Sequence, residues 1–241
     1  MDIQEKNIPV HVSMIMDGNG RWARERGKER TFGHMAGVES VRACTEAAVE
    51  IGVKYLSLFA FSEENWNRPD AEVSFLMEMM VKSMLNELPT LMKNGVRFRV
   101  LGNRARLSGS LNEAIDDCEA KTAGNERLTL IVFLSYSGKW DMLQAAKKMA
   151  SELLLHPERE REIMSMGTDD FSKYLVTAGV PDPDLIVRTS GESRMSNYLL
   201  WQGAYSELLF TDVMWPDFRK EQFREALAAY AKRDRRYGKV K

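Results

Sequence analysis

Asp17 stands at the head of a short segment that combines a carboxylate, two glycines and an arginine, Asp17-Gly18-Asn19-Gly20-Arg21. Glycines beside asparagine let the backbone turn tightly and point N–H groups into one concavity, which suits an anion. Arg21 adds a forked donor suited to phosphate, and the carboxylate is a hard oxygen ligand of the kind that Mg²⁺ prefers beside phosphates. The segment predicts a site for a diphosphate and Mg²⁺, with an ordinary Asx-Gly turn as the alternative.

Basic residues follow this turn at Arg24, Arg26, Lys28 and Arg30, and His34 comes next between two glycines. They could close over the first turn as a phosphate clamp, or they could form a solvated charged loop. His34 by itself is as compatible with a structural role as with ligand binding.

A second loop, Phe61-Ser62-Glu63-Glu64-Asn65-Trp66-Asn67-Arg68-Pro69, mixes hydroxyl, carboxylate, amide, indole and guanidinium groups. Because loops on a rigid scaffold carry function, this composition favours a binding loop. Asn67 or Asp70 could alternatively serve to cap the helix expected after it.

A third segment, residues 188–197, places Arg188 and Arg194 around hydroxyl residues and a glycine. Two guanidinium groups could hold a diphosphate by charge-assisted hydrogen bonds. The alternative is a solvated turn in which Glu192 pairs with an arginine. Glu207 could be a second metal ligand or a surface residue, and no local pattern decides between them.

The elements that must position these loops alternate between strands and helices. Apolar runs predict strands at 10–16, 55–61, 96–101, 128–134, 185–188 and 208–210, and helical spacing predicts helices at 38–51, from 69 to a kink or end near Pro89, at 108–123, 140–155, 171–178 and 218–235. This order indicates one α/β domain over residues 1–241, with a mostly parallel sheet of about six strands flanked by helices and a flexible segment at 1–9. In such sheets ligands bind beyond the carboxyl ends of the strands, where the three loops should meet.

The long helix after Pro69 carries a methionine-rich apolar stripe. The stripe fits the protein core by its helical period, and it also fits the wall of a hydrophobic tunnel, since methionine adapts to a flexible chain. Its members are Val73, Leu76, Met77, Met80, Met84, Leu88 and Leu91.

Composition narrows the class of protein. The net charge of the 241 residues is −1, which gives no basic field for nucleic acid. Cys44 and Cys118 are far apart and indicate a reducing compartment. The first residues lack the apolar region of a signal peptide and the apolar runs are too short for a membrane span, so we expect a cytoplasmic protein.

The motifs in this order resemble the cis-prenyltransferases over about residues 10–238. The resemblance rests on residues 11–23, Gly33-His34, 61–69, 185–192, 194–197, Trp201-Gln202 and 210–218. It implies a Mg²⁺-dependent enzyme that adds isopentenyl diphosphate repeatedly, in cis, to an allylic diphosphate such as farnesyl diphosphate. The expected product is a long-chain polyprenyl diphosphate, undecaprenyl diphosphate as a lipid carrier for cell-wall synthesis.

The resemblance also implies residue roles. Asp17 would position the metal and Asn65 would accept the proton, while Glu207 would complete the metal site from the neighbouring subunit of a homodimer. The allylic diphosphate would be held by Gly18, Asn19, Gly20, Arg21, Arg30 and His34. Isopentenyl diphosphate would be held by Arg188, Arg194 and Ser196. Trp22 and Met195 are also expected to bind substrate. The loop over the substrates would comprise Ser62, Glu63, Glu64, Trp66 and Arg68.

Two departures from the family pattern stand out. The family often has Asn-Tyr-Gly-Gly-Arg where this chain has Ser135-Tyr136-Ser137-Gly138-Lys139, and it often has His or another polar residue at Ser193. A non-catalytic partner subunit or an isoprenoid-binding protein on the same fold is the alternative, although such subunits lose the turn that this chain keeps. Peripheral contact with the inner face of a membrane, for product release, stays open.

Overall fold

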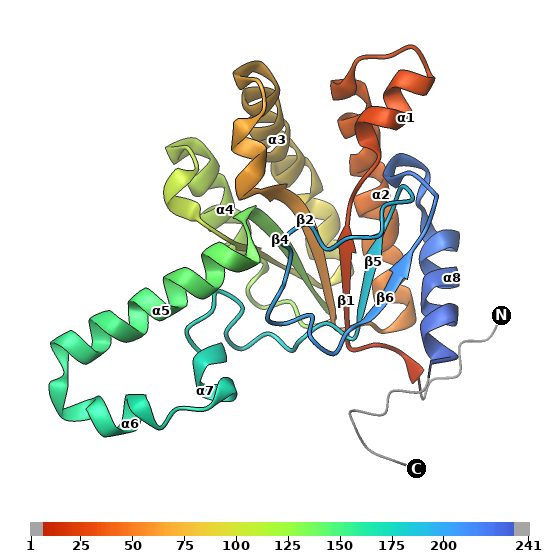
Figure 1. Cartoon of the computed structure of the whole chain (residues 1–241). Helices are drawn as coiled ribbons and strands as arrows, with labels where there is room; N and C mark the ends of the chain where they lie inside the picture. Colours follow the sequence, from red (N-terminus) through yellow and green to blue (C-terminus); the bar gives the residue numbers. More distant parts are fainter. Residues whose placement is uncertain (1–6, 234–241) are drawn as a thin grey trace.

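A computed structural model describes residues 7–233. Six parallel strands form one sheet in the order β3-β4-β2-β1-β5-β6, which confirms the predicted α/β class (Figure 1). The strands are β1 (His11–Ile15), β2 (Tyr55–Ser62), β3 (Val96–Leu101), β4 (Leu128–Tyr136), β5 (Leu185–Arg188) and β6 (Glu207–Phe210). All six predicted strands are therefore present.

Helices connect the strands and extend beyond the sheet. The α-helices are α1 (Asn19–Glu25), α2 (Arg30–Ile51), α3 (Asp70–Asn94), α4 (Gly109–Thr122), α5 (Gly138–Leu155), α6 (Glu160–Met164), α7 (Thr168–Ser172) and α8 (Lys220–Ala231). Short 3-10 helices are η2 (Glu63–Asn67), η3 (Arg104–Arg106), η4 (Pro157–Arg159) and η5 (Trp215–Asp217). None of the helices between residues 7 and 233 has the length and apolar character needed to cross a membrane.

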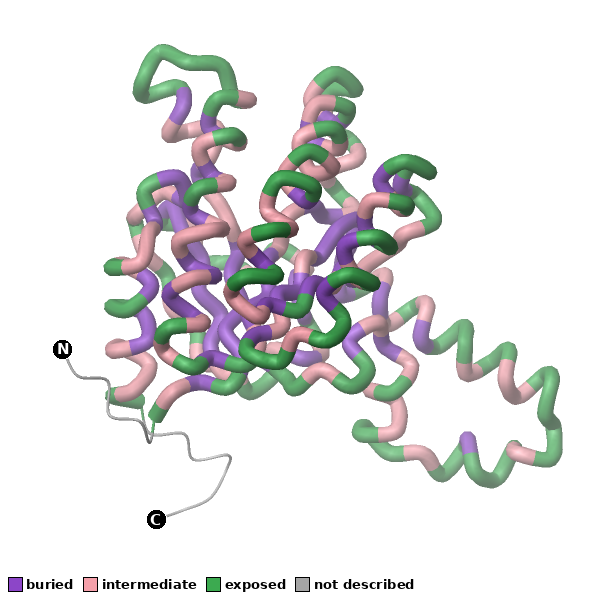
Figure 2. Tube along the Cα trace, turned by 180° about the vertical axis from the view of Figure 1, so that it is seen from behind, coloured by how far each residue is buried: buried purple, intermediate pink, exposed green. Residues whose placement is uncertain are grey.

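The two faces of the sheet are covered differently. The larger core lies where α2, α3, α4 and α8 pack on one face and contains Leu56, Leu111 and Phe223. The other face is covered by the start of α5 and by irregular chain between α7 and β6, with Tyr136 and Tyr198 at its centre. Burial is accordingly concentrated in the strands, whereas the arm formed by α5 and α6 is largely exposed (Figure 2).

Several local predictions were wrong. The helix predicted to begin near residue 38 begins at Arg30, so the basic run is not one continuous loop. α3 continues through Pro89 to Asn94, so the helix does not end at the proline, which was one of the two outcomes expected there, and both Met84 and Leu91 are buried. Burial of the apolar stripe on both sides of the proline offsets the lost hydrogen bond and the steric clash, which cost about 3 kcal/mol in a free helix.

The region between β4 and β5 also differs from expectation. The short helix predicted at 171–178 is α7, which ends at Ser172, and α6 was not predicted. Of the segment 1–9 that was expected to be flexible, residues 1–6 lie outside the described residues. Asn7 donates a side-chain hydrogen bond to the carbonyl of Ala231 at 3.0 Å, and Ile8 packs against the larger core.

Candidate active site

Asp17 follows the carboxyl end of β1 and is fixed by its backbone. Its N–H donates to Thr189 Oγ1 at 2.9 Å, and the Thr189 hydroxyl donates to the Asp17 carbonyl at 2.7 Å. Gly18 has φ 104°, and a side chain there would place its Cβ 2.7 Å from Ser190 Oγ. Glycine is required on both counts. The residues from Asn19 onward, expected as a turn, form the first turn of α1.

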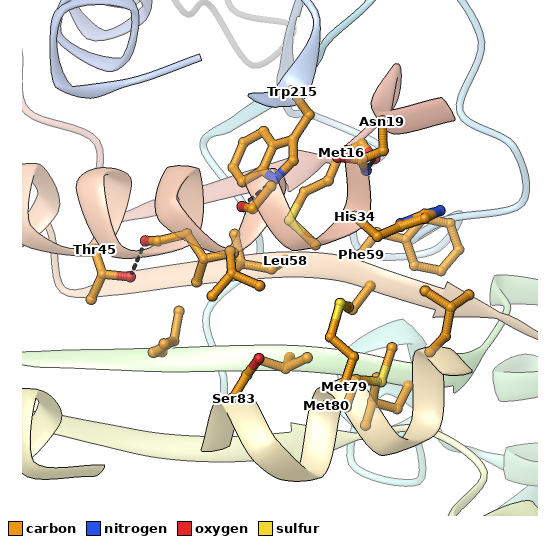
Figure 3. A pocket seen from close by; sticks show the side chains of 18 of the residues that line it. Met16, Asn19, His34, Thr45, Leu58, Phe59, Met79, Met80, Ser83 and Trp215 are labelled. Atoms are coloured by element: carbon orange, nitrogen blue, oxygen red, sulfur yellow. Dashed lines mark hydrogen bonds between the residues drawn. The ribbon is translucent and has the colours of Figure 1, made fainter. Parts of the chain in front are cut away.

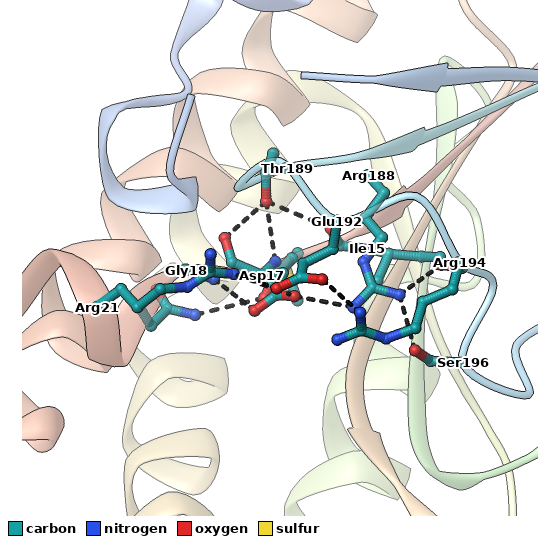
Figure 4. A network of polar contacts seen from close by, with 11 residues as sticks. Ile15, Asp17, Gly18, Arg21, Arg188, Thr189, Glu192, Arg194 and Ser196 are labelled. Carbon is teal, nitrogen blue, oxygen red and sulfur yellow. Dashed lines mark hydrogen bonds and ion pairs between the residues drawn. The ribbon is translucent and has the colours of Figure 1, made fainter. Parts of the chain in front are cut away.

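Arg188 meets the Asp17 carboxylate because β5 lies beside β1 in the sheet, with Arg188 in register with Ile15. The Arg188 guanidinium is buried and donates to Asp17 Oδ2 at 2.9 Å, to Ser196 Oγ at 2.7 Å and to the carbonyl of Arg194 (Figure 4). The predicted meeting of the first and third loops at the carboxyl end of the sheet is thus confirmed.

A second arginine borders the same carboxylate. Arg21 lies 3.7 Å from Asp17 Oδ2 and 3.2 Å from Glu192 Oε1, while Glu192 also pairs with Arg194 (Figure 4). The internal Arg–Glu192 pair considered as an alternative is therefore present, but within the cluster around Asp17. Several guanidinium groups balanced by two carboxylates form a site that a more highly charged anion could enter by displacing the carboxylates.

His34 lies within α2 and not on a loop, and it faces the same region. Burial and the neighbouring Arg68 cation lower the pKa of His34 to about 4, so the ring is neutral at pH 7. Three buried polar atoms of α1 and α2 have no hydrogen-bond partner among the described residues: His34 Nε2, Asn19 Oδ1 and Trp22 Nε1. Buried polar groups normally have partners, so these atoms are candidates to contact a ligand.

The second loop forms the 3-10 helix η2. The Asn65 N–H donates to Ser62 Oγ at 3.2 Å and the Ser62 N–H donates to Asn65 Oδ1 at 3.1 Å, which makes a reciprocal cap. Glu64 accepts a hydrogen bond from Asn197 Nδ2 at 2.7 Å, which links this loop to the third. The alternative, capping of the next helix by Asn67 or Asp70, is wrong, because Pro69 holds that position without a side-chain cap.

A cavity of about 700 Å³ begins at these groups and continues between the sheet, α2 and α3 (Figure 3). Asp17, Asn65 and Arg188 line its polar end. Its apolar wall includes Leu76, Met79, Met80, Met84 and Leu91 of α3, Val41 of α2, and Leu58, Phe98, Leu130, Val132 and Leu134 of the sheet. Part of the methionine-rich stripe therefore faces a cavity, while some of the same side chains are largely buried.

The predicted site residues divide between the cavity wall and its surroundings. Asp17, Asn19, His34, Ser62, Glu64, Asn65, Arg68, Arg188 and Ser196 line the cavity. Gly18, Gly20, Arg21, Trp22, Arg30, Arg194 and Met195 lie in the neighbouring segments outside that lining. Glu63 and Trp66 contact Ser135 and also lie outside that lining.

Sequence analysis missed several polar residues of the cavity. Arg42 and Thr45 of α2 and Ser83 and Glu87 of α3 line it, and Arg42 pairs with Glu87 across the two helices. Thr45 lies one helical turn after Val41, which also lines the cavity, so the helical period offered a signal for it. The pairing between α2 and α3 had no sequence signal.

Glu207 lies far along the sheet from the Asp17 of its own chain. It begins β6 in register with Leu185, at the amino end of the sheet, whereas Asp17 lies beyond the carboxyl end. Among residues 7–233, no group of three or more His, Cys, Asp or Glu side chains could hold a metal ion. Asp17 and Glu192 are thus the two carboxylates of this chain that lie beside the arginines of the cluster.

Comparison with known proteins agrees with this geometry. The profile of a family described as "Putative undecaprenyl diphosphate synthase" matches residues 15–238. An isoprenyl transferase of Rhizobium meliloti is 48% identical over 96% of this chain and 93% of its own length. A ditrans,polycis-undecaprenyl-diphosphate synthase of Haemophilus ducreyi, named as specific for (2E,6E)-farnesyl diphosphate, is 46% identical over 99% of this chain and 97% of its own.

The fold agrees as well. The crystal structure of lavandulyl diphosphate synthase from Lavandula x intermedia, in complex with dimethylallyl diphosphate, superposes with a TM-score of 0.92. That protein is 32% identical, and the match covers 97% of this chain and 100% of the other. Together with the cavity and its arginine-lined end, these similarities establish that the chain belongs to the undecaprenyl diphosphate synthase family of prenyltransferases.

Proposed function

We propose that this enzyme adds isopentenyl diphosphate repeatedly to farnesyl diphosphate, with cis double bonds, and releases undecaprenyl diphosphate as a lipid carrier for cell-wall synthesis. The observation that carries this proposal is a cavity that joins an arginine- and carboxylate-lined end to an apolar wall. A prenyl diphosphate has the same division, because a charged head group is attached to a hydrocarbon chain. The apolar part would act as a tunnel for the growing chain.

The two diphosphates would occupy neighbouring positions at the polar end. Arg188, Arg194 and Ser196, with Met195 beside them, would hold isopentenyl diphosphate, and their mutual contacts support that grouping. The allylic diphosphate would lie at the start of α1, near Arg30 and the unpartnered atoms of Asn19, Trp22 and His34. Holding both substrates side by side makes the condensation effectively intramolecular.

The Asp17 carboxylate fits a Mg²⁺ ion held mainly by substrate oxygens. Mg²⁺ commonly binds through one or two carboxylates plus phosphates and waters, so one protein ligand per chain suffices. When bound, Mg²⁺ would neutralise charge on the leaving diphosphate. Asp17 is within reach of both Arg21 and Arg188, and its release from Arg188 would free an oxygen for the metal.

Asn65 is the proposed proton acceptor, and its position at the cavity wall supports contact with substrate. A neutral amide is a weak base, so a diphosphate oxygen is the competing acceptor. Replacing Asn65 with Ala should lower turnover about 100-fold if the amide takes or relays the proton. Near-normal turnover in that variant would assign the proton to diphosphate.

We also propose a homodimer in which Glu207 acts in the partner's site. Glu207 cannot reach its own Asp17, and β6 is an edge strand on which Leu208 and Phe210 are each 40% exposed. Mixing Asp17→Ala and Glu207→Ala chains tests this. In a two-fold dimer, re-equilibrated equal amounts should regain about a quarter of wild-type activity, because half the dimers are mixed and each has one intact site. No regain would place Glu207 outside the partner's site.

The reaction itself is tested with farnesyl diphosphate, labelled isopentenyl diphosphate and Mg²⁺, followed by sizing of the product. Extension by many units that stops on chelation supports the proposal. Binding of farnesyl diphosphate without extension would instead favour a non-catalytic or isoprenoid-binding protein. We propose a cytoplasmic location with peripheral membrane contact at product release, to be tested by co-sedimentation with vesicles that contain the product.

A further inference from the structure

We propose that Ser135 is a positioning residue that seats the Asn65-bearing helix η2 by joining Trp66 and Glu63 through one hydroxyl. The inference rests on the proposed function, since it concerns the loop that carries Asn65. Ser135 lies at the carboxyl end of β4 and is fully buried. It does not line the cavity, so it would act on substrate only through η2.

The Ser135 hydroxyl uses both of its hydrogen-bonding roles. It accepts from the indole N–H of Trp66 at 2.8 Å and donates to Glu63 Oε1 at 2.6 Å. Glu63 Oε2 accepts from Arg106 at 2.7 Å, and the Arg106 guanidinium lies 4.7 Å from the centre of the Trp66 ring. These four side chains form a closed ring of contacts, which we call the Ser135 clamp.

The geometry of η2 links this clamp to the cavity. A 3-10 helix has three residues per turn, so residues three apart share one face. Glu63 and Trp66 share the face that contacts Ser135, whereas Glu64 and Asn65 of the same helix line the cavity, as does the capping residue Ser62. Because both faces belong to one short helix, a shift of the clamp would move the Asn65 amide relative to the substrates.

Backbone conformation and backbone contacts around Ser135 also hold the clamp in place. Ser135 has φ 49°, a left-handed conformation that is uncommon for serine, and its carbonyl accepts from the Asn103 N–H at 2.9 Å. Gly102 has φ 141°, and a Cβ there would lie 1.9 Å from the Leu134 carbonyl oxygen. The link from β3 to η3 is therefore held tightly against the end of β4, which places Arg106 beside Trp66.

Asparagine could take the place of Ser135 with both hydrogen bonds of the clamp kept. Asparagine tolerates the left-handed conformation better than serine does. Its side chain also provides an acceptor oxygen for the indole and a donor N–H for the carboxylate, on different atoms. Ser135→Asn is therefore the conservative variant, and it should preserve the clamp.

Three variants separate the hydroxyl from the backbone conformation. Ser135→Ala removes both hydrogen bonds and keeps a side chain at positive φ, Ser135→Gly removes both and relieves the conformation, and Ser135→Asn supplies both. For a single condensation, the Ala and Gly variants should lose about tenfold in kcat with KM for the diphosphates within about twofold of wild type, and the Asn variant should stay near wild type. Thermal melting establishes that each variant is folded.

A second measurement does not depend on catalysis. The indole N–H of Trp66, identified in NMR spectra by its loss in Trp66→Phe, should exchange faster with solvent in the Ala and Gly variants than in wild type and the Asn variant. Activity of Ser135→Gly equal to that of Ser135→Asn, a loss confined to KM, or an unchanged exchange rate would each overturn the inference. If wild type fails to extend farnesyl diphosphate, the proposed function fails, while the exchange measurement still decides the clamp.

Discussion

Replacing Asp17 with Asn should separate two roles that the structure combines in one carboxylate. Asp17 pairs with Arg188 at 2.9 Å and lies 3.7 Å from Arg21. An entering diphosphate must compete with Asp17 for the same guanidinium groups and must approach a like charge. The amide oxygen of the Asp17→Asn variant would keep the acceptor for the Gly18 N–H, which is 2.7 Å from Asp17 Oδ1, while the negative charge is removed.

The size of the effect follows from distance and exposure. Two unit charges about 4 Å apart interact by about 4 kcal/mol at an effective dielectric constant near 20. The Asp17 side chain is 31% exposed, so solvent screening reduces the repulsion of a diphosphate to about 1–2 kcal/mol. Metal-free pyrophosphate should therefore bind about 5–30-fold more tightly to the variant than to wild type. Turnover with Mg²⁺ should fall at least about 100-fold, because the metal loses its carboxylate ligand.

Calorimetric titration of inorganic pyrophosphate in EDTA at fixed ionic strength measures the first effect, and product formation measures the second. Asp217→Asn is the matched control, since Asp217 pairs with Arg26 at 3.4 Å on the surface and both side chains are more than 40% exposed. It should change neither quantity. Weaker metal-free binding in the Asp17 variant would refute the competition for Arg188, and full turnover would refute the metal role.

Three further predictions concern the scaffold and the cavity. Gly37→Ala should lower the free energy of unfolding by about 1–3 kcal/mol, because its Cβ would lie 2.6 Å from Asn19 Oδ1. Gly109 has open space around it, so Gly109→Ala should not destabilise the protein, and urea unfolding of both variants tests the difference. Burial lowers the pKa of His11 from 6.5 to about 4, so below pH 6.5 the unfolded chain binds a proton that the folded chain does not. For this group the free energy of unfolding should therefore fall by about 1.4 kcal/mol per pH unit down to about pH 4. Unfolding measured at several pH values should show a smaller dependence of stability on pH in His11→Gln than in wild type. Met84→Trp should fill part of the cavity and so shorten the product, whose length is measured by chromatography. An unchanged product length would show that the hydrocarbon chain of the product lies outside this cavity.

The order of elements and the chemistry at the strand ends could be predicted from the sequence, because both depend on local signals. Apolar runs indicated all six strands, and Gly18 marked the turn after β1. The predicted meeting of the loops followed from a general property of parallel sheets, since their carboxyl ends share one edge. The family motifs also named Asp17, Asn65 and Arg188, which the fold brings together at the polar end of one cavity.

Other features depended on tertiary contacts. The pairing of β5 with β1 joins segments more than 170 residues apart, and this pairing places Arg188 against Asp17. The continuation of α3 through Pro89 depends on burial that no local propensity contains. Similarly, η2 turns Trp66 towards Ser135 and Asn65 towards the cavity, although the sequence placed both in one binding loop.

The sequence by itself therefore determined which residues carry charge and hydrogen-bonding capacity at the ends of the strands, and roughly where each strand and helix lies. Tertiary structure alone decided which of those side chains line the cavity and which hold the cavity-lining side chains in position. The physical reason is that periodicity and turn propensity act over a few residues. By contrast, side-chain direction at the site is set by packing and hydrogen bonds between strands and loops distant in the chain.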